Sequence, residues 1–146
     1  MKNIFLLGIT LFFLSNGAKA QKNPDDIVGI WLTGSGKAHV KIDNIKGYFF
    51  GRIVWLREPN NIEGKPKIDK NNPDKSKQNI HMLGLRLLDG FEYKSENNWE
   101  KGTIYDPENG KTYSCKIHLD DNKTMKIRGF IGISLLGRTD TWTRVK

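Results

Sequence analysis

Hydrophobic and polar residues alternate along most of this chain with a period of two. The segment 37–42 places alanine, valine and isoleucine on one face and lysine and histidine on the other, which is typical of a β-strand with one buried face. The segments 113–119 and 125–133 repeat the pattern, and 48–56 is rich in aromatic and β-branched residues that favour a strand buried on both faces or nearly so. No ten-residue segment after Leu14 has a clear helical period.

Turn-forming residues separate these runs. The segment 106–110 contains Asn-Gly, a strong hairpin signal because both residues tolerate positive φ. The segments 43–47 and 120–122 indicate two further hairpin loops. We therefore predict an all-β fold, an antiparallel up-and-down β-barrel of about eight strands, because closure of the sheet removes exposed strand edges.

One segment, 57–79, does not fit this pattern. It holds three prolines, six basic and four acidic residues, and only two large aliphatic residues, Ile62 and Ile68. A structureless loop of that length within a compact domain is uncommon and is often functional; the alternative is a solvated excursion without a role. Its acidic residues do not form a calcium loop, because Pro73 occupies a ligand position and no closing glutamate follows.

The first twenty residues have the features of a cleaved signal peptide. Lys2 precedes an uncharged apolar run from Ile4 to Leu14, and Ala18 and Ala20 provide small residues at the −3 and −1 positions. The run is too short to cross a bilayer, and no second apolar stretch reaches that length. We predict cleavage after Ala20, which leaves residues 21–146 as one barrel domain, periplasmic or secreted and not an integral membrane protein.

Charge and cysteine content narrow the function classes. Residues 1–20 include Lys2, Lys19 and no acidic residue, so cleavage lowers the formal charge from +8 to +6. Export and the dispersal of the lysines over polar strand faces argue against a nucleic-acid partner. Cys115 has no second cysteine to pair with, and its place on an apolar strand face predicts a buried structural thiol.

The sequence contains few of the motifs that carry catalysis or bind metals. The three histidines have no metal-ligand spacing, and no Gly-x-Ser-x-Gly elbow or phosphate loop is present. We therefore predict no catalytic residue, no metal site and no cofactor. The remaining enzyme hypothesis ranks below the two binding hypotheses described at the end of this section and above nucleic-acid binding. It would use Asp106 or Asp140 beside an arginine, although Asp106 also fits a turn residue ahead of Pro107.

The C-terminal segment 128–144 is the richest in candidate residues. In an extended strand Arg138, Asp140, Trp142 and Arg144 share one face. A guanidinium inside a barrel would hold a ligand carboxylate or phosphate with two parallel hydrogen bonds. The alternative is structural: an ion pair between Arg138 and Asp140, with Arg144 capping the end of the barrel.

Several longer motifs match a known family. The matching segments begin at Asp26 and end near Val145: DIVGIW at 26–31, GRIVWL at 51–56, DKNNPD at 69–74, IYDPENGKTY at 104–113 and RGFIGISLLGRTDTWTR at 128–144. In these segments the chain resembles the secreted bacterial family of unknown function numbered 2147, which has no settled biochemical activity.

A second, shorter pattern consists of Gly29-Ile30-Trp31 near the predicted mature N-terminus and Arg144 on the last predicted strand. The tripeptide is similar to the Gly-x-Trp signature of lipocalins, and Arg144 is similar to the arginine that packs over that tryptophan. This resemblance, to lipocalins and other calycins, is the looser of the two. The resemblance implies that Trp31 and Arg144 close one end of the barrel and are structural. It also implies a pocket for a small apolar molecule.

The leading functional hypothesis is an exported, calycin-like barrel that binds a small hydrophobic or amphipathic ligand, since eight strands enclose one small ligand or fill with side chains. Alternation does not say which of the candidate side chains point inward. The alternative is a surface binding module for an anionic envelope component or protein partner, with no internal ligand. The predicted ligand-binding residues are Tyr48, Trp55, Tyr105, Arg128, Phe130, Arg138 and Trp142.

Overall fold

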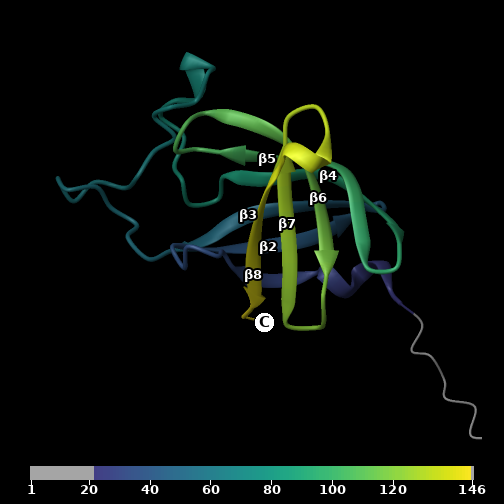
Figure 1. Ribbon diagram of the computed structural model, residues 1–146. Helices are drawn as coiled ribbons and strands as arrows, with labels where there is room; N and C mark the ends of the chain where they lie inside the picture. The colour runs from purple at the N-terminus through teal and green to yellow at the C-terminus, as the bar shows by residue number, and fades with distance from the viewer. Residues whose placement is uncertain (1–21, 146) are drawn as a thin grey trace, which may run out of the picture.

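A computed structural model describes residues 22–145; the predicted signal peptide lies outside this range. The model confirms the all-β prediction: eight antiparallel strands follow one another around a closed up-and-down barrel (Figure 1). The strands are β1 (Gly29–Leu32), β2 (Ala38–Ile45), β3 (Tyr48–Leu56), β4 (Arg86–Ser95), β5 (Asn98–Asp106), β6 (Lys111–Leu119), β7 (Thr124–Phe130) and β8 (Arg138–Arg144). Three short 3₁₀ helices accompany them: η1 (Pro24–Ile27), η2 (Lys75–Lys77) and η3 (Ser134–Leu136).

The first strand closes the barrel by pairing on both sides. Strand β1 pairs with β2 over its whole length and with β8 at two positions, Trp31 with Arg144 and Leu32 with Thr143. Every strand therefore has two neighbours, and the sheet closes on itself through this short β1–β8 seam.

The meander gives the barrel two different ends. One end carries the connections 33–37, 57–85, 107–110 and 131–137, and we refer to it as the open end. The opposite end, here the closed end, carries helix η1 and the tight connections between β2 and β3, β4 and β5, and β6 and β7.

Two of the closed-end turns have only two residues, and both need positive φ. Lys46 and Gly47 have φ of 54° and 87°, and Glu96 and Asn97 have φ of 50° and 65°. These values suit the tight hairpin turns that match the twist of paired strands. The sequence indicated the first turn within 43–47 but not the second, because Glu-Asn carries a weaker turn signal than a pair that contains glycine.

Large side chains fill the barrel from the closed end to its middle. The fully buried residues include Trp31, Phe49, Phe91 and Trp99. Packing at the middle is tight: a Cβ atom placed on Gly102 would lie only 2.4 Å from the ring of Phe91. Glycine at this position lets the phenylalanine ring lie directly over the neighbouring strand β5.

The connection from β3 to β4 is the longest in the molecule and spans residues 57–85. It contains η2 and two isolated bridges, Asn60 with Pro66 and Ile68 with His81. Figure 1 shows it extending away from the barrel at the open end, on the left of the view.

Candidate functional site

Helix η1 covers the closed end. The Asn23 side chain accepts a hydrogen bond from the Asp25 amide, and the Asp26 carboxylate accepts one from the Asn23 amide, a reciprocal cap that fixes the start of the turn. Ile27 is fully buried, and the Trp99 indole donates to the Pro24 carbonyl at 3.1 Å. The helix is thus held to the barrel wall by apolar packing and a hydrogen bond.

Trp31 and Arg144 lie beneath this helix, where the lipocalin resemblance implies them. The Arg144 guanidinium carbon is 4.2 Å from the centre of the Trp31 ring, and the Trp31 indole donates to the Ile27 carbonyl at 2.9 Å. Arg144 also donates to the carbonyls of Val28, Asp26 and Asn122. Burial lowers the pKa of Arg144 from its usual value, and the stacked, hydrogen-bonded guanidinium closes this end of the barrel.

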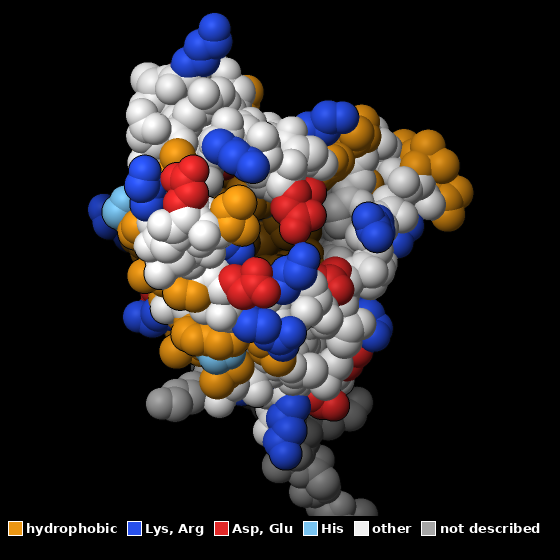
Figure 2. Space-filling view, turned by 90° about the vertical axis from the view of Figure 1, so that its left-hand side faces the viewer, with side chains coloured by type: hydrophobic (Ala, Val, Ile, Leu, Met, Phe, Trp, Pro, Cys, Tyr) orange, Lys and Arg blue, Asp and Glu red, His pale blue; other side chains and the backbone are white. Residues whose placement is uncertain are grey.

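The open end is built differently, because all but one of its apolar inward-facing residues are only partly covered, the exception being the buried Ala38. Ile104 of β5 pairs with Tyr113 of β6, and Gly102 pairs with Cys115. Because Gly102 and Cys115 face inward and side chains alternate along a strand, Ile104 and Tyr113 also point inward. Figure 2, viewed from the side of the residue 57–85 connection, shows a hollow with hydrophobic side chains at its base and acidic and basic side chains around it. The apolar residues at inward positions of the open end are Ala38, Leu56, Ile104, Tyr113 and Gly129.

Asp140 joins two elements at the rim. Its carboxylate accepts hydrogen bonds from the Gly34 amide at 3.2 Å and from the Trp142 indole at 2.8 Å. A Cβ on Gly34 would lie 1.9 Å from an Asp140 oxygen, so the β1–β2 connection approaches β8 as closely as it does only with glycine there. These bonds hold Asp140 in place, and within residues 22–145 the expected ion pair between Asp140 and Arg138 does not form. Arg138 therefore remains an exposed cation on the inner-facing register of β8.

Two family motifs meet beside this rim. The fully buried carboxylate of Asp69 accepts hydrogen bonds from the Tyr105 hydroxyl and from the Asn72 side chain, each at 2.8 Å. Burial, together with this carboxylate, raises the pKa of Tyr105 to about 12. The motif 69–74 is thereby anchored to β5.

The same connection also reaches the β5–β6 turn. The Asn71 side chain donates to the carbonyls of Pro107 and Glu108 at 3.1 and 2.9 Å. Gly110 has φ of 71°, and a Cβ there would lie 2.0 Å from the Asn71 carbonyl oxygen. Asp106 accepts from the Glu108 amide at 2.9 Å and acts as the turn residue expected ahead of Pro107. The sequence did not reveal this contact, because it joins residues more than thirty positions apart.

The seven predicted ligand-binding residues do not form one site. Trp142 is buried inside the barrel, and Arg138 lies on the same strand face nearer the open end. The other five lie elsewhere: Tyr48 is exposed at the closed end, Trp55 stacks on His39 on the outer wall, Tyr105 bonds Asp69, and Arg128 and Phe130 occupy outer positions of β7.

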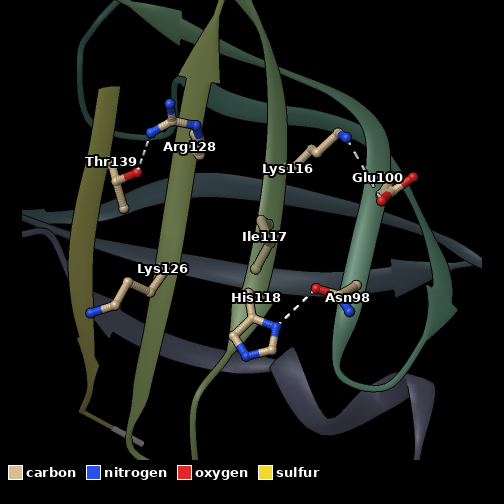
Figure 3. Close-up of a pocket in the computed structure, with 8 residues that line it drawn as sticks. All are labelled: Asn98, Glu100, Lys116, Ile117, His118, Lys126, Arg128 and Thr139. Carbon is tan, nitrogen blue, oxygen red and sulfur yellow. Dashed lines mark hydrogen bonds and ion pairs between the residues drawn. The ribbon is translucent and has the colours of Figure 1, made fainter. Parts of the chain in front are cut away.

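A shallow hollow of about 240 Å³ crosses the outer wall of β5 to β8 (Figure 3). Its polar groups are largely engaged with one another. His118 Nδ1 lies 2.8 Å from the Asn98 side-chain oxygen, and the Arg128 guanidinium donates to the Thr139 hydroxyl at 2.8 Å. The lining residues are Asn98, Glu100, Lys116, Ile117, His118, Lys126, Arg128 and Thr139.

Cys115 is buried on the inner face of β6, where apolar surroundings raise the pKa of its thiol to about 12. We expect native protein near pH 8 to react with dithionitrobenzoate at least about a hundredfold more slowly than protein unfolded in urea, since only the exposed thiolate attacks. The pKa of the Cys115 thiol is higher in the folded protein than in the unfolded chain. The contribution of this thiol to stability is therefore complete below about pH 9 and is lost as the pH rises toward 12.

Absorbance of the thionitrobenzoate released from the reagent measures the rate of thiol modification. Urea unfolding of Cys115→Ala and wild type between about pH 8 and 10 measures the pH dependence of stability that comes from this thiol. The alanine variant should lose less stability over this interval. Equal thiol reactivity in native and unfolded protein would contradict the buried placement.

Other candidate features are absent from the described residues. Within residues 22–145, no group of three or more histidine, cysteine or acidic side chains is placed to hold a metal ion. Over the same range, no helix has the length and apolar character to span a membrane.

Comparison with known proteins identifies the family. The model of the family described as uncharacterized protein conserved in bacteria, DUF2147, matches residues 29–144. The chain belongs to this family. The matched region begins at β1 and ends at the last residue of β8, so the DUF2147 domain coincides with the barrel. No curated protein matches the chain.

Among solved structures, the barrel is similar to protein HP1028 from the human pathogen Helicobacter pylori, which is described as belonging to the lipocalin family. The TM-score is 0.69 with 21% sequence identity, and the match covers 82% of each chain. At this identity the likeness concerns the fold. It confirms that the DUF2147 barrel is lipocalin-like, as the sequence predicted.

Proposed function

We propose that this protein binds a small amphipathic molecule in the open end of its barrel. The observation that carries the proposal is the difference between the two ends. Helix η1, Trp31 and Arg144 plug one end, whereas the apolar inward positions at the other remain partly exposed around a hollow (Figure 2). A lipocalin-like barrel with one open end is compatible with a small-molecule site, because such sites are concave and mainly apolar with a few polar groups.

The packing of the interior limits the kind of ligand. Phe91 lies against Gly102 at the middle of the barrel, so the space available begins above this level. A short alkyl chain or a small ring fits such a shallow site, and its polar group would remain at the rim. Arg138 of β8 is a cation on the inner-facing register there, as is Lys111 of β6, which favours a carboxylate or another anionic group.

The proposal includes export, with residues 1–20 as the signal peptide. The alternative, a surface module acting through the 57–79 loop, has weaker support because its lysines have acidic neighbours. Lys65, Lys67 and Lys77 lie within 3.4 to 3.7 Å of Glu63, Glu58 and Asp74, respectively.

Native mass spectrometry and thermal shift with decanoate, hexadecanoate and decanol test the proposal. We expect decanoate to bind and raise the melting temperature, and Gly129→Val to weaken this binding at least about tenfold by filling the site. A Cβ on Gly129 would already lie 3.4 Å from Ile104 and 3.6 Å from Tyr113. The control Ser114→Val introduces the same valine at an exposed position of β6 and should bind as wild type does.

The position of the polar group is tested separately with Arg138→Gln. This variant should bind decanoate less tightly and decanol unchanged, because only the carboxylate pairs with the guanidinium. Binding that is unaffected by Gly129→Val, or no binding of any of the three molecules, would contradict a site in the open end.

A further inference from the structure

The connection between β7 and β8 presents an unusual amount of apolar surface. Its seven residues, 131–137, contain four aliphatic side chains, two glycines, one serine and no charge. Ile131, Ile133, Leu135 and Leu136 are 72%, 60%, 82% and 77% exposed. Scattered apolar residues are normal on a protein surface, but four within one short loop form a patch that indicates an interaction site. We refer to residues 131–137 as the apolar loop.

The apolar loop projects from the open end and does not fold back onto the barrel. Figure 1 shows it rising above β6 and β7, and Figure 2 shows hydrophobic side chains protruding at the upper right, where this connection lies. The surface is therefore convex. Protein partners that add a strand need an exposed strand edge, and the apolar loop itself contains no strand.

Contacts within the described residues hold the loop in this projecting form. The Leu136 amide donates to the Ile133 carbonyl at 3.2 Å, which forms the turn of η3. The Arg128 guanidinium donates to the Leu135 carbonyl at 3.1 Å and to the Thr139 hydroxyl at 2.8 Å. The backbone is thus supported from below while the leucine side chains point away from the protein.

The charged residues that flank the loop most closely in the sequence are both basic. Arg128 lies three positions before the loop and Arg138 follows it directly, and the twelve residues from 128 to 139 include no aspartate or glutamate. A convex apolar tip with cations at its base matches the layered chemistry of a bilayer surface, in which acyl chains lie beneath anionic phosphates.

We propose that the apolar loop inserts into the surface of bilayers that contain anionic lipids, with Arg128 and Arg138 near the lipid phosphates. Insertion would turn the open end of the barrel toward the membrane. The inference stands without an internal ligand, and it assigns the anionic surface to a different part of the chain from the charge-balanced 57–79 loop.

Cosedimentation of the mature protein with vesicles of phosphatidylglycerol and phosphatidylcholine tests this interaction. We expect Leu135→Ser/Leu136→Ser to reduce vesicle binding at least about tenfold, because both exposed side chains lose their partitioning into the bilayer. Ile62→Ser, which replaces a fully exposed aliphatic on the 57–85 connection, is the matched control and should bind as wild type does. Vesicles of phosphatidylcholine alone should bind wild type more weakly by about fivefold or more, because the arginines lose their anionic partners.

Insertion is measured directly with Leu136→Trp and brominated lipids. We expect quenching of its fluorescence beyond that of the native tryptophans, three of which are buried. Wild-type binding by the double serine variant, loss of binding in Ile62→Ser, or absence of the added quenching would overturn the proposal. So would a concentration-dependent dimer that the serine substitutions abolish, since a second copy would then cover the loop.

The vesicle result can be separated from the proposed ligand site. The double serine variant leaves the inward positions of the open end unchanged, so it should bind decanoate in the absence of vesicles as wild type does. Gly129→Val, conversely, should bind vesicles normally. Failure of one pair of measurements therefore leaves the other proposal standing.

Discussion

Replacement of Trp31 by alanine is expected to lower the free energy of unfolding by about 3–5 kcal/mol, the usual range for truncating a large, fully buried aromatic side chain. The Trp31 ring is fully buried, its indole donates to the Ile27 carbonyl, and it supports the guanidinium of Arg144. Its loss would leave a cavity beneath helix η1 that the closed barrel cannot collapse to fill. Urea unfolding followed by circular dichroism measures the change.

Trp55→Ala is the matched control for this prediction. Trp55 lies on the outer wall, 40% exposed, with its ring centre 4.3 Å from that of His39. We expect its removal to lower the free energy of unfolding by less than about 1.5 kcal/mol, because exposed aromatic contacts contribute little beyond their buried area. Equal losses for the two variants would contradict the description of Trp31 as the plug of the closed end.

Arg144→Ala is expected to lower the free energy of unfolding by about 2–4 kcal/mol, through lost charged hydrogen bonds and the lost cation–π contact. Arg144 joins three separate segments, because it donates to Asp26, Val28 and Asn122. Arg138→Ala, an exposed arginine on the same face of the same strand, is the control and should change stability by less than about 0.5 kcal/mol.

Two further variants separate the contributions of Arg144. Arg144→Lys keeps the charge but not the planar fork, so its stability should fall between those of wild type and the alanine variant. The loss of unfolding free energy in the double variant Trp31→Ala/Arg144→Ala should be smaller than the sum of the two single losses by about 0.5–2 kcal/mol, because the two side chains contact each other. Strict additivity would mean that the stacking contributes nothing measurable.

Much of the barrel could be predicted from local patterns. Alternation at 113–119 put Tyr113, Cys115 and Ile117 on one face, and the structure has that face inward. The same holds for β8, where Trp142 takes the inner face together with Asp140 and Arg138. These predictions succeed because a side-chain period of two is a property of any extended strand.

Particular irregularities explain why the candidate site was less predictable. Strict alternation places Trp55 on the same face as Ile53, but a bulge at Val54 pairs Trp55 with His39 and turns it outward. In β7, Gly129 takes the inner position, so Arg128 and Phe130 on either side of it face outward. A bulge or a glycine at an inner position leaves little trace in the pattern of polar and apolar residues.

The sequence by itself therefore determined the all-β class, a count of about eight strands, the family, and the residues that share a face in strands without a bulge. Only the tertiary structure decided which of the candidate side chains point inward, that helix η1 covers the closed end, and that the apolar loop projects. It also brought Asp69 to Tyr105 and Asn71 to the β5–β6 turn. The physical reason is that strand periodicity is local, whereas burial depends on contacts between residues far apart in the chain.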